Sequence, residues 1–583
     1  MNVTICCINS KYVHSSLAPW YLAAAMERCA FCKTQPVEGT INQPVEQIVE
    51  KVLAQTPDVA AFCCYIWNIE TVRQAVTEIK QNRPGCTIVL GGPEVSFCAE
   101  QILRDWPQVS YVLCGEGEEN FPALMQCLAE GSSPARIPGL ARRGAGNRIS
   151  VNATEPLKNP LPNPYTKEYL ASLQGRIAYL ETSRGCPFSC SFCLSGVKEK
   201  VRFFDWETSK QNLLLLANSG AKTVKFIDRT FNCRADRAYD WIAFLIENAG
   251  KAFPADVCFH FEVAADLFDE RTLALLATAP AGLIQMEAGL QSFDEKTLEA
   301  VDRKTDIEKL TANLKKIIAP HNVHLHIDLI AGLPYEDYKT FGGSFNRAFA
   351  LRPHMLQLGF LKMLHGSKVR RQAETLPEMQ YCFGEHPPYE VQSNRWIGRE
   401  ELAKLHEVED ALERMYNSGR FLCTLEYVLQ ATEWDAFSLF ERFGAYAKLQ
   451  GAAAGTGLDA YTLWIKSFFE KVPGVEAGRL RDCLVTDRLS CDNTGRIPPF
   501  LRIEDKRLKK AKRQARIKLE AQGKIGVALL YSPLRVAAFD YAEKDVITGR
   551  YAMQIFDLEE NDEPTGTGQK RDKRSGRADG GAV

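Results

Sequence analysis

Apolar runs alternate with helix-like spacings over the first 133 residues. The runs are typical of buried strands and lie at residues 3–8, 59–64, 87–90 and 111–114. Apolar side chains recur at helical spacing between them, over residues 45–54, 69–81 and 99–105. Strands alternating with helices predict a doubly wound, Rossmann-like parallel sheet, which binds ligands beyond the carboxyl ends of its strands. Two glycine-rich turns fall at such ends, Gly91-Gly92-Pro93 and Gly115-Glu116-Gly117-Glu118, although each alone also fits a tight turn before a helix.

The same alternation resumes after a hairpin-like stretch and a proline-rich segment. These two form a predicted linker over residues 136–170, between an N-terminal domain at 1–135 and a second α/β domain at 171–372. Strands of the second domain are predicted at residues 177–180, 223–227, 257–261, 283–286, 324–330 and 355–360. Six β/α units in about 200 residues predict a partial, TIM-like (β/α)6 barrel, whose site residues lie just after the strands.

Helical spacing dominates the rest of the chain, so a mostly helical C-terminal domain is predicted for residues 373–557. It includes a basic helix at residues 504–522, a pattern that can contact phosphate or RNA. Acidic residues nearby and a net charge near zero favour a solvated face instead, so the nucleic-acid signal is not strong. Residues 558–583 are polar and glycine-rich, which predicts a disordered tail.

Composition narrows the class of protein. A chain of 583 residues is too long for one hydrophobic core, so several domains are expected. Its 71 basic and 72 acidic residues give no overall charge for binding nucleic acid or acidic membranes. No basic segment precedes the first apolar run and no apolar run reaches 18 residues, so neither a signal peptide nor a membrane span is predicted. Nineteen cysteines scattered over a large chain fit a reducing cytoplasm better than a secreted disulfide scaffold.

Three cysteines lie within eight residues, directly after Thr182-Ser-Arg-Gly185. Cys186, Cys190 and Cys193 form a C-x3-C-x2-C run. Three thiolates on one tight loop can bind three irons of a cubane cluster and leave the fourth iron open, and an open position distinguishes a catalytic metal site from a structural one. Zinc would require a fourth Cys or His with paired spacing, and no such partner run is apparent. The separate pair Cys29 and Cys32 lies on a predicted helix and fits buried thiols better.

The C-x3-C-x-aromatic-C pattern, with Phe192 before the third cysteine, resembles the radical S-adenosylmethionine (radical SAM) superfamily over residues 171–370. The resemblance implies that SAM chelates the open iron of a 4Fe-4S cluster and that an electron, from an external reductant such as flavodoxin or ferredoxin, cleaves SAM to a 5′-deoxyadenosyl radical. The family's usual Gly-Gly-Glu is absent here, so Asp228 is taken as the contact to the SAM amino group. Glu262 fits a hydrogen bond within the barrel core equally well. The SAM contacts implied by the resemblance are Phe192, Asp228, Glu262, Glu287, Gln291, Ser292 and Gly332.

A doubly wound domain before such a barrel resembles the cobalamin-binding radical SAM proteins, in the subset with an uncharacterised helical C-terminal extension. No histidine in the chain has Asp two residues before it, so the Asp-x-His-x-x-Gly motif is absent and base-off cobalamin without a histidine ligand is expected. A hydrogen bond is favoured over a cobalt contact for His14. The cobalamin contacts implied by the resemblance are Asn9, His14, Ser15, Gly91, Gly92, Pro93, Gly115, Glu116 and Gly117.

The resemblance implies a cytoplasmic enzyme that cleaves SAM and uses cobalamin, most often as a C-methyltransferase, although ring contraction and cyclisation also occur in this subfamily. Two alternatives stay open. One is a radical SAM methylthiotransferase acting on tRNA or protein, which needs a second cluster and usually a C-terminal β-barrel module. The other is a non-catalytic iron–sulfur redox or sensor protein. The residues assign neither a substrate nor a catalytic side chain.

Overall fold

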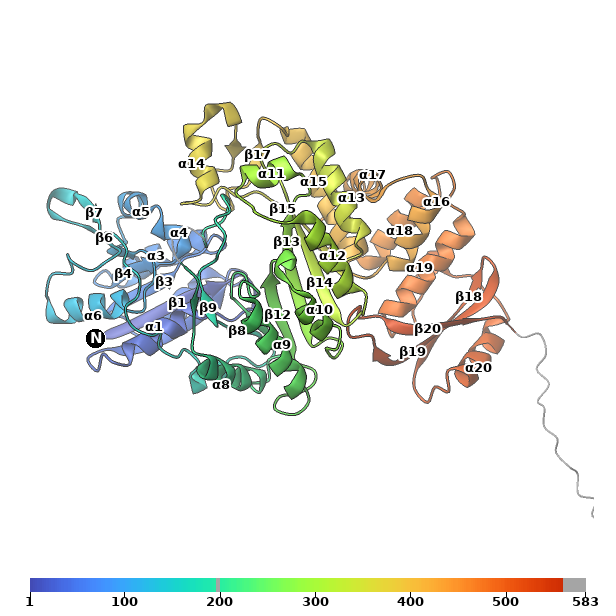
Figure 1. Ribbon diagram of the computed structural model, residues 1–583, viewed down its shortest axis with the longest axis horizontal. Helices are drawn as coiled ribbons and strands as arrows, with labels where there is room; N and C mark the ends of the chain where they lie inside the picture. The colour runs from blue at the N-terminus through green and yellow to red at the C-terminus, as the bar shows by residue number, and fades with distance from the viewer. Residues whose placement is uncertain (196–199, 559–583) are drawn as a thin grey trace, which may run out of the picture.

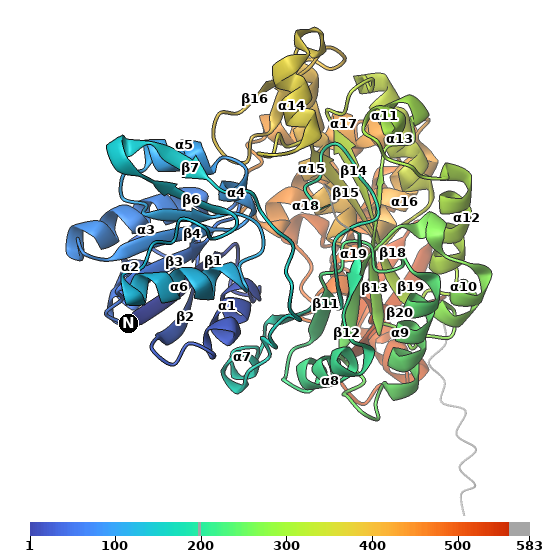
Figure 2. The same ribbon diagram turned by 60° about the vertical axis from the view of Figure 1, so that its left-hand side comes forward.

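The computed structural model describes residues 1–195 and 200–558, so the predicted tail lies outside the described residues except for Leu558. Figure 1 shows three lobes along the longest axis: an N-terminal sheet, a central barrel and a C-terminal domain. The turned view in Figure 2 shows helices around the outside of the barrel sheet, so its inner face is directed away from them. Within the described ranges, no helix has both the length and the apolar character needed to cross a membrane.

The N-terminal domain is a seven-stranded sheet in the order β2-β1-β3-β4-β5-β6-β7. The first five strands are parallel, which confirms the predicted doubly wound sheet. The strands are β1 (Asn2–Asn9), β2 (Lys33–Thr40), β3 (Val59–Cys63), β4 (Thr87–Gly91), β5 (Tyr111–Leu113), β6 (Leu140–Arg143) and β7 (Ile149–Val151). The helices are α1 (Ala18–Met26), α2 (Val45–Leu53), α3 (Ile69–Asn82), α4 (Pro93–Ser96), α5 (Ala99–Asp105) and α6 (Asn120–Glu130).

Three features of this domain differ from the sequence prediction. Strand β2 was missed because its first half is polar and contains Pro36, as an edge strand allows. Cys29 and Cys32 lie in the turn before β2 rather than on a helix. The hairpin β6–β7 pairs antiparallel with β5, so it extends the N-terminal sheet instead of forming part of the linker.

The second domain is a sheet of six parallel strands in chain order, β8-β11-β12-β13-β14-β15, as the partial barrel requires. These strands are β8 (Ile177–Leu180), β11 (Thr223–Phe226), β12 (Cys258–Val263), β13 (Ile284–Gln291), β14 (Val323–Ala331) and β15 (Met355–Phe360). Burial alternates along β13 and β14: apolar residues face the helices, and polar residues face the interior. Chain segments before and after the cysteines pair as β9 (Ser183–Arg184) and β10 (Arg202–Phe203).

Aspartates start most of the barrel helices. An aspartate carboxylate at the N-cap accepts the backbone N–H three residues later, which satisfies a donor that the helix cannot and contributes about 1 kcal/mol. Short α7 (Lys167–Ala171) precedes the barrel and is capped by Thr166 instead. The helices with an Asp cap are α8 (Trp206–Ala217), α10 (Glu270–Leu276), α11 (Glu295–Ala300), α12 (Ile307–Ile318) and α13 (Tyr338–Ala350); α9 (Ala235–Asn248) has none.

The C-terminal domain is mostly helical, as predicted, but it also contains an antiparallel sheet that the sequence prediction missed. Its small elements near the barrel are α14 (Lys368–Thr375), β16 (Cys382–Phe383) and β17 (Val391–Ser393). The main helices are α15 (Arg399–Leu412), α16 (Leu422–Ala431), α17 (Ala436–Leu449), α18 (Leu458–Phe469), α19 (Ala477–Cys491) and α20 (Leu508–Lys518). The sheet comprises β18 (Ile525–Tyr531), β19 (Leu534–Lys544) and β20 (Tyr551–Phe556).

Aromatic side chains join the C-terminal domain to the barrel. Phe345 on α13 packs against Phe437 and Phe440 on α17, with ring centroids 5.6 and 5.9 Å apart. These residues belong to one continuous buried cluster that includes the barrel core. Since buried aromatic contacts contribute strongly to packing, the two domains are expected to stay in a fixed orientation.

Helix α17 can approach α15 closely because position 444 is glycine. A Cβ added at Gly444 would lie 2.4 Å from the carbonyl oxygen of Glu407, and this backbone atom cannot move aside. We expect Gly444→Ala to destabilise the protein by about 1–3 kcal/mol through overpacking. Gly343→Ala in α13 is the matched control, because a Cβ there has no atom within 4 Å and a helical alanine is favoured. Thermal denaturation of both variants measures the difference, and equal melting temperatures would contradict the packing argument.

Candidate active site

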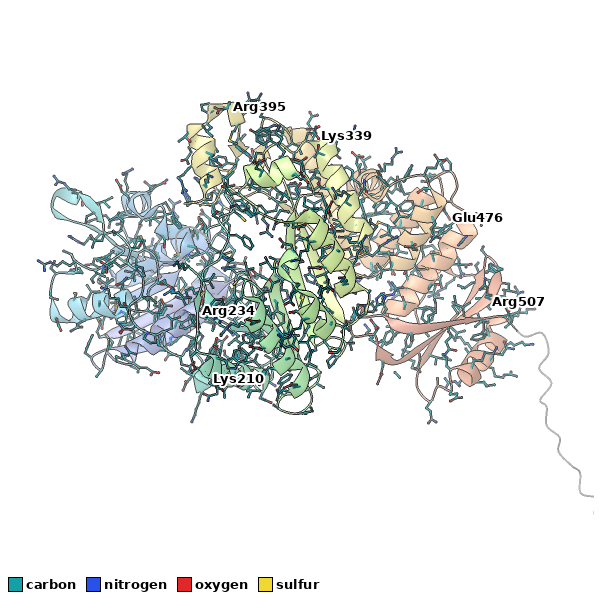
Figure 3. All side chains as sticks on the ribbon, viewed as in Figure 1. Lys210, Arg234, Lys339, Arg395, Glu476 and Arg507 are labelled. Carbon is teal, nitrogen blue, oxygen red and sulfur yellow. The ribbon has the colours of Figure 1, made fainter. Side chains whose placement is uncertain are left out.

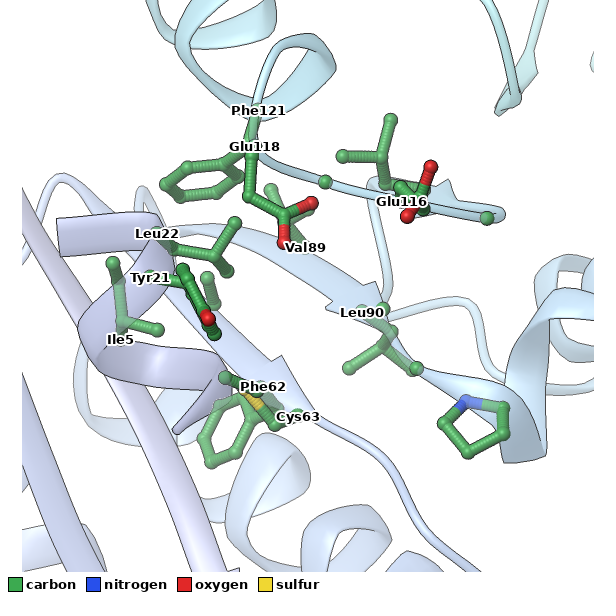
Figure 4. Close-up of a pocket in the computed structure, with 18 of the residues that line it drawn as sticks. Ile5, Tyr21, Leu22, Phe62, Cys63, Val89, Leu90, Glu116, Glu118 and Phe121 are labelled. Carbon is green, nitrogen blue, oxygen red and sulfur yellow. The ribbon is translucent and has the colours of Figure 1, made fainter. Parts of the chain in front are cut away.

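A cavity of about 340 Å3 lies at the carboxyl ends of β3, β4 and β5 (Figure 4). Its wall is mainly apolar, and it includes every residue of the two predicted glycine turns together with the carboxylates of Glu116 and Glu118. A mainly apolar hollow with a few polar groups is typical of a cofactor site. Arg184 of the barrel also lines the cavity, so the cavity lies beside the strand that leads to the cysteines.

One of the pocket glycines is needed for the fold of its turn. Gly92 has φ +108°, and a Cβ there would lie 2.5 Å from the carbonyl oxygen of Cys64, a backbone atom. A Cβ at Gly117 would lie 2.9 Å from the end of the flexible Leu22 side chain, which can shift. The turn at Gly92 therefore packs against a neighbouring segment at a distance that only glycine allows.

The first loop of the N-terminal domain contacts the barrel rather than the cavity. Asn9, His14 and Ser15 do not line the cavity. His14 Nδ1 lies 2.8 Å from the hydroxyl of Tyr179, the hydrogen-bonding role favoured from the sequence, and burial lowers its pKa. Ser15 donates to the Ile177 carbonyl at 2.8 Å, and Asn9 donates to Glu38 at 2.8 Å. His14 and Ser15 therefore contact the barrel directly, whereas Asn9 contacts Glu38, which pairs with Arg176 at the start of the barrel.

The three cysteines lie on the loop that follows β9. Cys190 is buried, with 8% of its surface exposed, and its Sγ accepts from Arg303 at 3.8 Å. Burial raises the pKa of the Cys190 thiol, and the positive charge of Arg303 opposes that rise. Cys186 Sγ lies 3.4 Å from the hydroxyl of Thr230, and Cys193 Sγ accepts the backbone N–H of Ser195 at 3.4 Å. Among the described residues, no three His, Cys, Asp or Glu side chains converge on a single metal position. A cubane cluster does not require such convergence, because each thiolate binds a separate iron.

Asp228 supports the cysteine loop from beneath. Its carboxylate accepts the backbone N–H groups of Thr182 and Ser183 at 2.8 and 3.1 Å and the Thr182 hydroxyl at 2.5 Å. Burial raises the pKa of this carboxyl to about 6. Because both oxygens are already engaged by the loop, the geometry favours a supporting role over the contact to the SAM amino group expected from the sequence.

Carboxylates from neighbouring strands meet on the inner face of the barrel. Lys225 Nζ lies 3.4 Å from Glu262 and 3.3 Å from Glu287. A hydrogen bond from His260, at 3.2 Å, and the Lys225 charge lower the pKa of Glu287 to about 2. Burial raises the pKa of the adjacent Asp328, so the pKa values of these two neighbouring carboxyl groups are shifted in opposite directions.

Two acceptors at this inner face have no partner in the described part of the chain. They are Gln291 Oε1 and Asp328 Oδ1, and both are buried. Buried acceptors are normally hydrogen-bonded, so an unpaired pair on one barrel wall indicates a ligand that donates N–H or O–H groups. SAM carries an ammonium group and ribose hydroxyls, and therefore fits these residues.

Other predicted SAM residues are distributed differently. Ser292 is fully buried and points away from the interior: its hydroxyl donates to Glu336 at 2.6 Å and accepts the Asp294 N–H at 2.9 Å. Phe192 is partly buried against the barrel core. Gly332 has φ +87°, and the space that its missing side chain leaves is bordered by Val391 of the C-terminal domain at 3.5 Å.

The sequence prediction missed the role of Arg184. Its Nη1 donates to Glu116 at 2.7 Å and to Glu118 at 2.9 Å, and its other nitrogens contact both Glu181 oxygens at 2.8 Å. Arg202 pairs with Glu116 as well. Burial opposes the charge of Arg184, but the hydrogen bonds and charges of the three carboxylates raise its pKa. Arg184 thus connects the cysteine loop to the wall of the N-terminal cavity, a contact that neither motif alone could reveal.

The Arg184–Glu118 pair can be tested by a double-mutant cycle. Arg184→Gln leaves three partly buried carboxylates without their shared cation, so we expect a loss of about 3 kcal/mol in stability. Adding Glu118→Gln should restore part of that loss, because it removes one uncompensated charge, with a coupling energy of about 1–3 kcal/mol. Denaturation of wild type, both single variants and the double variant measures the coupling. Strictly additive effects would show that the pair does not interact.

The Glu336 carboxyl accepts a hydrogen bond from the Ser292 hydroxyl, and its titration can be tested by the pH dependence of stability. Burial raises its pKa to about 7, although the hydroxyls of Ser292 and Ser344 oppose the rise. Between about pH 4.5 and pH 7, the Glu336 carboxyl is therefore protonated in the folded state and ionised in the unfolded state. Stability from this group is present at low pH and is lost as pH rises through 7. Lowering the pH from 8 to 5.5 should stabilise wild type by about 2 kcal/mol relative to Glu336→Gln. Equal pH dependence of the two melting temperatures would contradict this.

Three sequence families match this chain. The B12 binding domain matches residues 3–125, the Radical SAM superfamily residues 180–348, and the Protein of unknown function (DUF4080) residues 378–535. These matches confirm the resemblance inferred from the cysteine motif and the glycine turns. The Radical SAM family uses a 4Fe-4S cluster and SAM, and the B12-binding match supports cobalamin as a third cofactor.

Two curated relatives are each 28% identical to part of this chain. One is the 2-(S-pantetheinyl)-carbapenam-3-carboxylate methyltransferase of Streptantibioticus cattleyicolor, with 49% of this chain and 44% of the relative covered. The other is the cobalamin-dependent radical SAM methyltransferase TokK of Streptomyces tokunonensis, with 51% and 45% covered. The chain thus spans less than half the length of these relatives.

Two solved structures share the fold. The radical SAM methyltransferase TsrM from Kitasatospora setae has a TM-score of 0.54 at 17% identity, covering 65% of this chain and 76% of its own. The cobalamin-dependent SAM radical enzyme OxsB has a TM-score of 0.58 at 13% identity, covering 84% of this chain and 78% of its own. This chain therefore contains a Radical SAM domain, preceded by a B12 binding domain and followed by a DUF4080 region.

Proposed function

We propose that this chain is a cobalamin-dependent radical SAM enzyme that cleaves SAM reductively and methylates a carbon of its substrate. The observation that carries the proposal is the juxtaposition of the cysteine loop with the N-terminal cavity, joined through Arg184 to Glu116 and Glu118. A methyl carrier and a radical source must act on the same substrate atom, so their sites must adjoin. The two curated relatives described above are named as methyltransferases, which supports methyl transfer over other radical chemistry.

The proposed cluster ligands are Cys186, Cys190 and Cys193, with Arg303 as a positive charge beside Cys190. When bound, the cluster supplies the electron that cleaves SAM, and cobalamin supplies the methyl carrier. Asp228 orients the cluster loop by accepting the backbone N–H groups of Thr182 and Ser183. The pocket turns that contain Gly91, Gly92, Pro93, Gly115, Glu116 and Gly117 would hold the corrin.

Side chains of the inner barrel wall would orient SAM. Gln291 and Asp328 each offer a buried acceptor without a partner among the described residues, and Glu262 and Glu287 lie on the same wall. Phe192 and Gly332 remain proposed contacts to SAM. Ser292 is better assigned to support, because its hydroxyl is engaged with Glu336 and Asp294.

Location and reductant belong to the same proposal. All nineteen cysteines are free thiols, which is typical of a reducing compartment and supports the cytoplasm. We infer that an external reductant such as flavodoxin or ferredoxin supplies the electron that the cluster passes to SAM.

A methylthiotransferase is a weaker candidate. The enzymes of that class need a second cluster from three N-terminal cysteines. Of the six considered, Cys6, Cys7, Cys63 and Cys64 are buried in or beside the sheet, and only Cys29 and Cys32, in the turn before β2, are partly exposed. Burial raises the pKa of the Cys6 thiol, which disfavours the thiolate that binds iron. Iron analysis separates the two: about four irons per chain support the proposal, and about eight support two clusters.

The cluster assignment is tested by Cys190→Ala. Anaerobically reconstituted wild type, given SAM and dithionite, should produce 5′-deoxyadenosine, and the variant should produce none because one iron loses its ligand. Cys382→Ala is the matched control, since Cys382 is exposed and lies on β16 outside the site. Formation of 5′-deoxyadenosine by the Cys190 variant would refute the cluster assignment. Its absence in wild type would favour a non-catalytic iron–sulfur protein.

A further inference from the structure

A second cavity lies in the C-terminal domain, in the lobe at the opposite end of the molecule from the N-terminal sheet (Figure 1). Its volume is about 1050 Å3, and it is bounded by α20, β18 and the segment at residues 495–506. The methylation chemistry proposed above uses none of these residues. The volume is several times that of one phosphate group, so an extended ligand fits it better than a single small ion.

Positive charge dominates the cavity wall. The cationic lining residues are Arg481, Arg496, Arg502, Lys506, Lys509 and Lys512, and the acidic ones are Glu504 and Asp505. Asp505 is already engaged by Arg507 at 2.7 Å and by the Tyr531 hydroxyl at 3.1 Å. The wall therefore offers more positive charge than its own carboxylates neutralise.

The three lysines of this wall have no counter-charge among the described residues. Lys506, Lys509 and Lys512 form no ion pair with any residue of the described chain, and all three are exposed. By contrast, Arg481 stabilises the C-terminal domain, because it donates hydrogen bonds to Asp482 and to the Leu529 carbonyl, each at 2.8 Å. The free lysines lie along the mouth of the cavity, where they can meet an anionic partner.

The concentration of charge is local to this segment. Residues 495–518 contain ten Lys and Arg against two acidic residues, whereas the whole chain has 71 against 72. Like charges one helical turn apart, such as those of Lys509 and Lys512 on α20, repel each other. Ala511 and Ala515 bury the opposite face of α20 against the sheet, which keeps Lys509 and Lys512 directed away from it. This arrangement fits a polyanion.

The inner part of the cavity is apolar. Val527, Ala528 and Leu529 of β18 line it together with Leu508 and Ile503, and 48% of the Ile503 surface is exposed. Tyr531 adds one aromatic ring at the same wall, and the Arg481 guanidinium lies 5.3 Å from its centroid. A cationic rim above an apolar and aromatic floor suits a strand whose phosphates meet the lysines while its bases face the floor. An acidic polypeptide would meet the rim but has no aromatic bases for the floor.

We propose that this cavity binds a single-stranded nucleic acid through its phosphate backbone. The sequence alone favoured a solvated face for the basic helix. The structure adds a lined groove and unpaired lysines to the charge pattern, and these favour binding of a polyanion. The proposal is independent of the radical chemistry and should hold for the full chain with or without its cofactors.

The test is fluorescence anisotropy of the full-length protein with a labelled 20-nucleotide oligo(U), in 50 to 300 mM salt. Lys509→Gln/Lys512→Gln should weaken binding at least tenfold at low salt. It should also reduce the slope of log affinity against log salt by about 1.4, roughly 0.7 for each lost phosphate contact. The matched control is Lys251→Gln/Lys339→Gln, two exposed lysines outside the groove. Figure 3 shows Lys339 on α13, well separated from Arg507 beside α20. The control should bind as wild type does.

Each outcome is decisive. Circular dichroism and melting temperatures establish that both double variants are folded, and oligo(dT) measures whether the sugar matters. Equal binding by wild type and the groove variant would overturn the proposal, as would the absence of wild-type binding at 50 mM salt. Competition by poly-glutamate as effective as that of unlabelled oligo(U) would assign the groove to an acidic protein and would also overturn it.

Discussion

The contact of Arg184 with three glutamates is the constraint on which the arrangement of the site depends. Glu116 and Glu118 come from the cavity turn and Glu181 from the end of β8, and none of the three is more than 20% exposed. Partly buried carboxylates so close together would repel one another strongly without a shared cation. The guanidinium satisfies all three in one plane of hydrogen bonds, which a lysine could not do. The cysteine loop must therefore remain beside the N-terminal cavity.

Further contacts across the domains keep this orientation. Arg176 pairs with Glu38, and it donates to the backbone carbonyls of Tyr12 and His14. On the other side, the buried hydroxyl of Tyr389 donates to Glu94 at 2.6 Å. The C-terminal region therefore contacts the N-terminal domain directly, next to the turn that contains Gly92. All three chain regions thus contribute to the surroundings of one site.

Much of the fold could be predicted from local pattern. Five of the six barrel strands were predicted to within two residues of their ends, because a buried parallel strand between helices has a strong apolar signal; β13 extends five residues beyond its predicted end. Strand β2 and the sheet β18–β20 were missed: β2 is a polar edge strand, and the others lie in a region where helices dominate. Ser292 follows the last residue of β13, where periodicity no longer predicts the direction of a side chain. Its partners Glu336 and Asp294 became visible only in the structure.

The sequence by itself determined the cysteine motif and hence the cluster chemistry, because three thiols within eight residues are held close by the chain alone. It also determined the glycine turns and the order of the domains. Only the tertiary structure decided which charges meet. Arg184 and Glu116 are 68 residues apart and Tyr389 and Glu94 are 295 apart, so no local pattern could pair them. The same holds for Asp228, whose carboxylate proved to support the cysteine loop. Short-range geometry follows from chain connectivity, whereas long-range partners depend on how the sheets and helices pack.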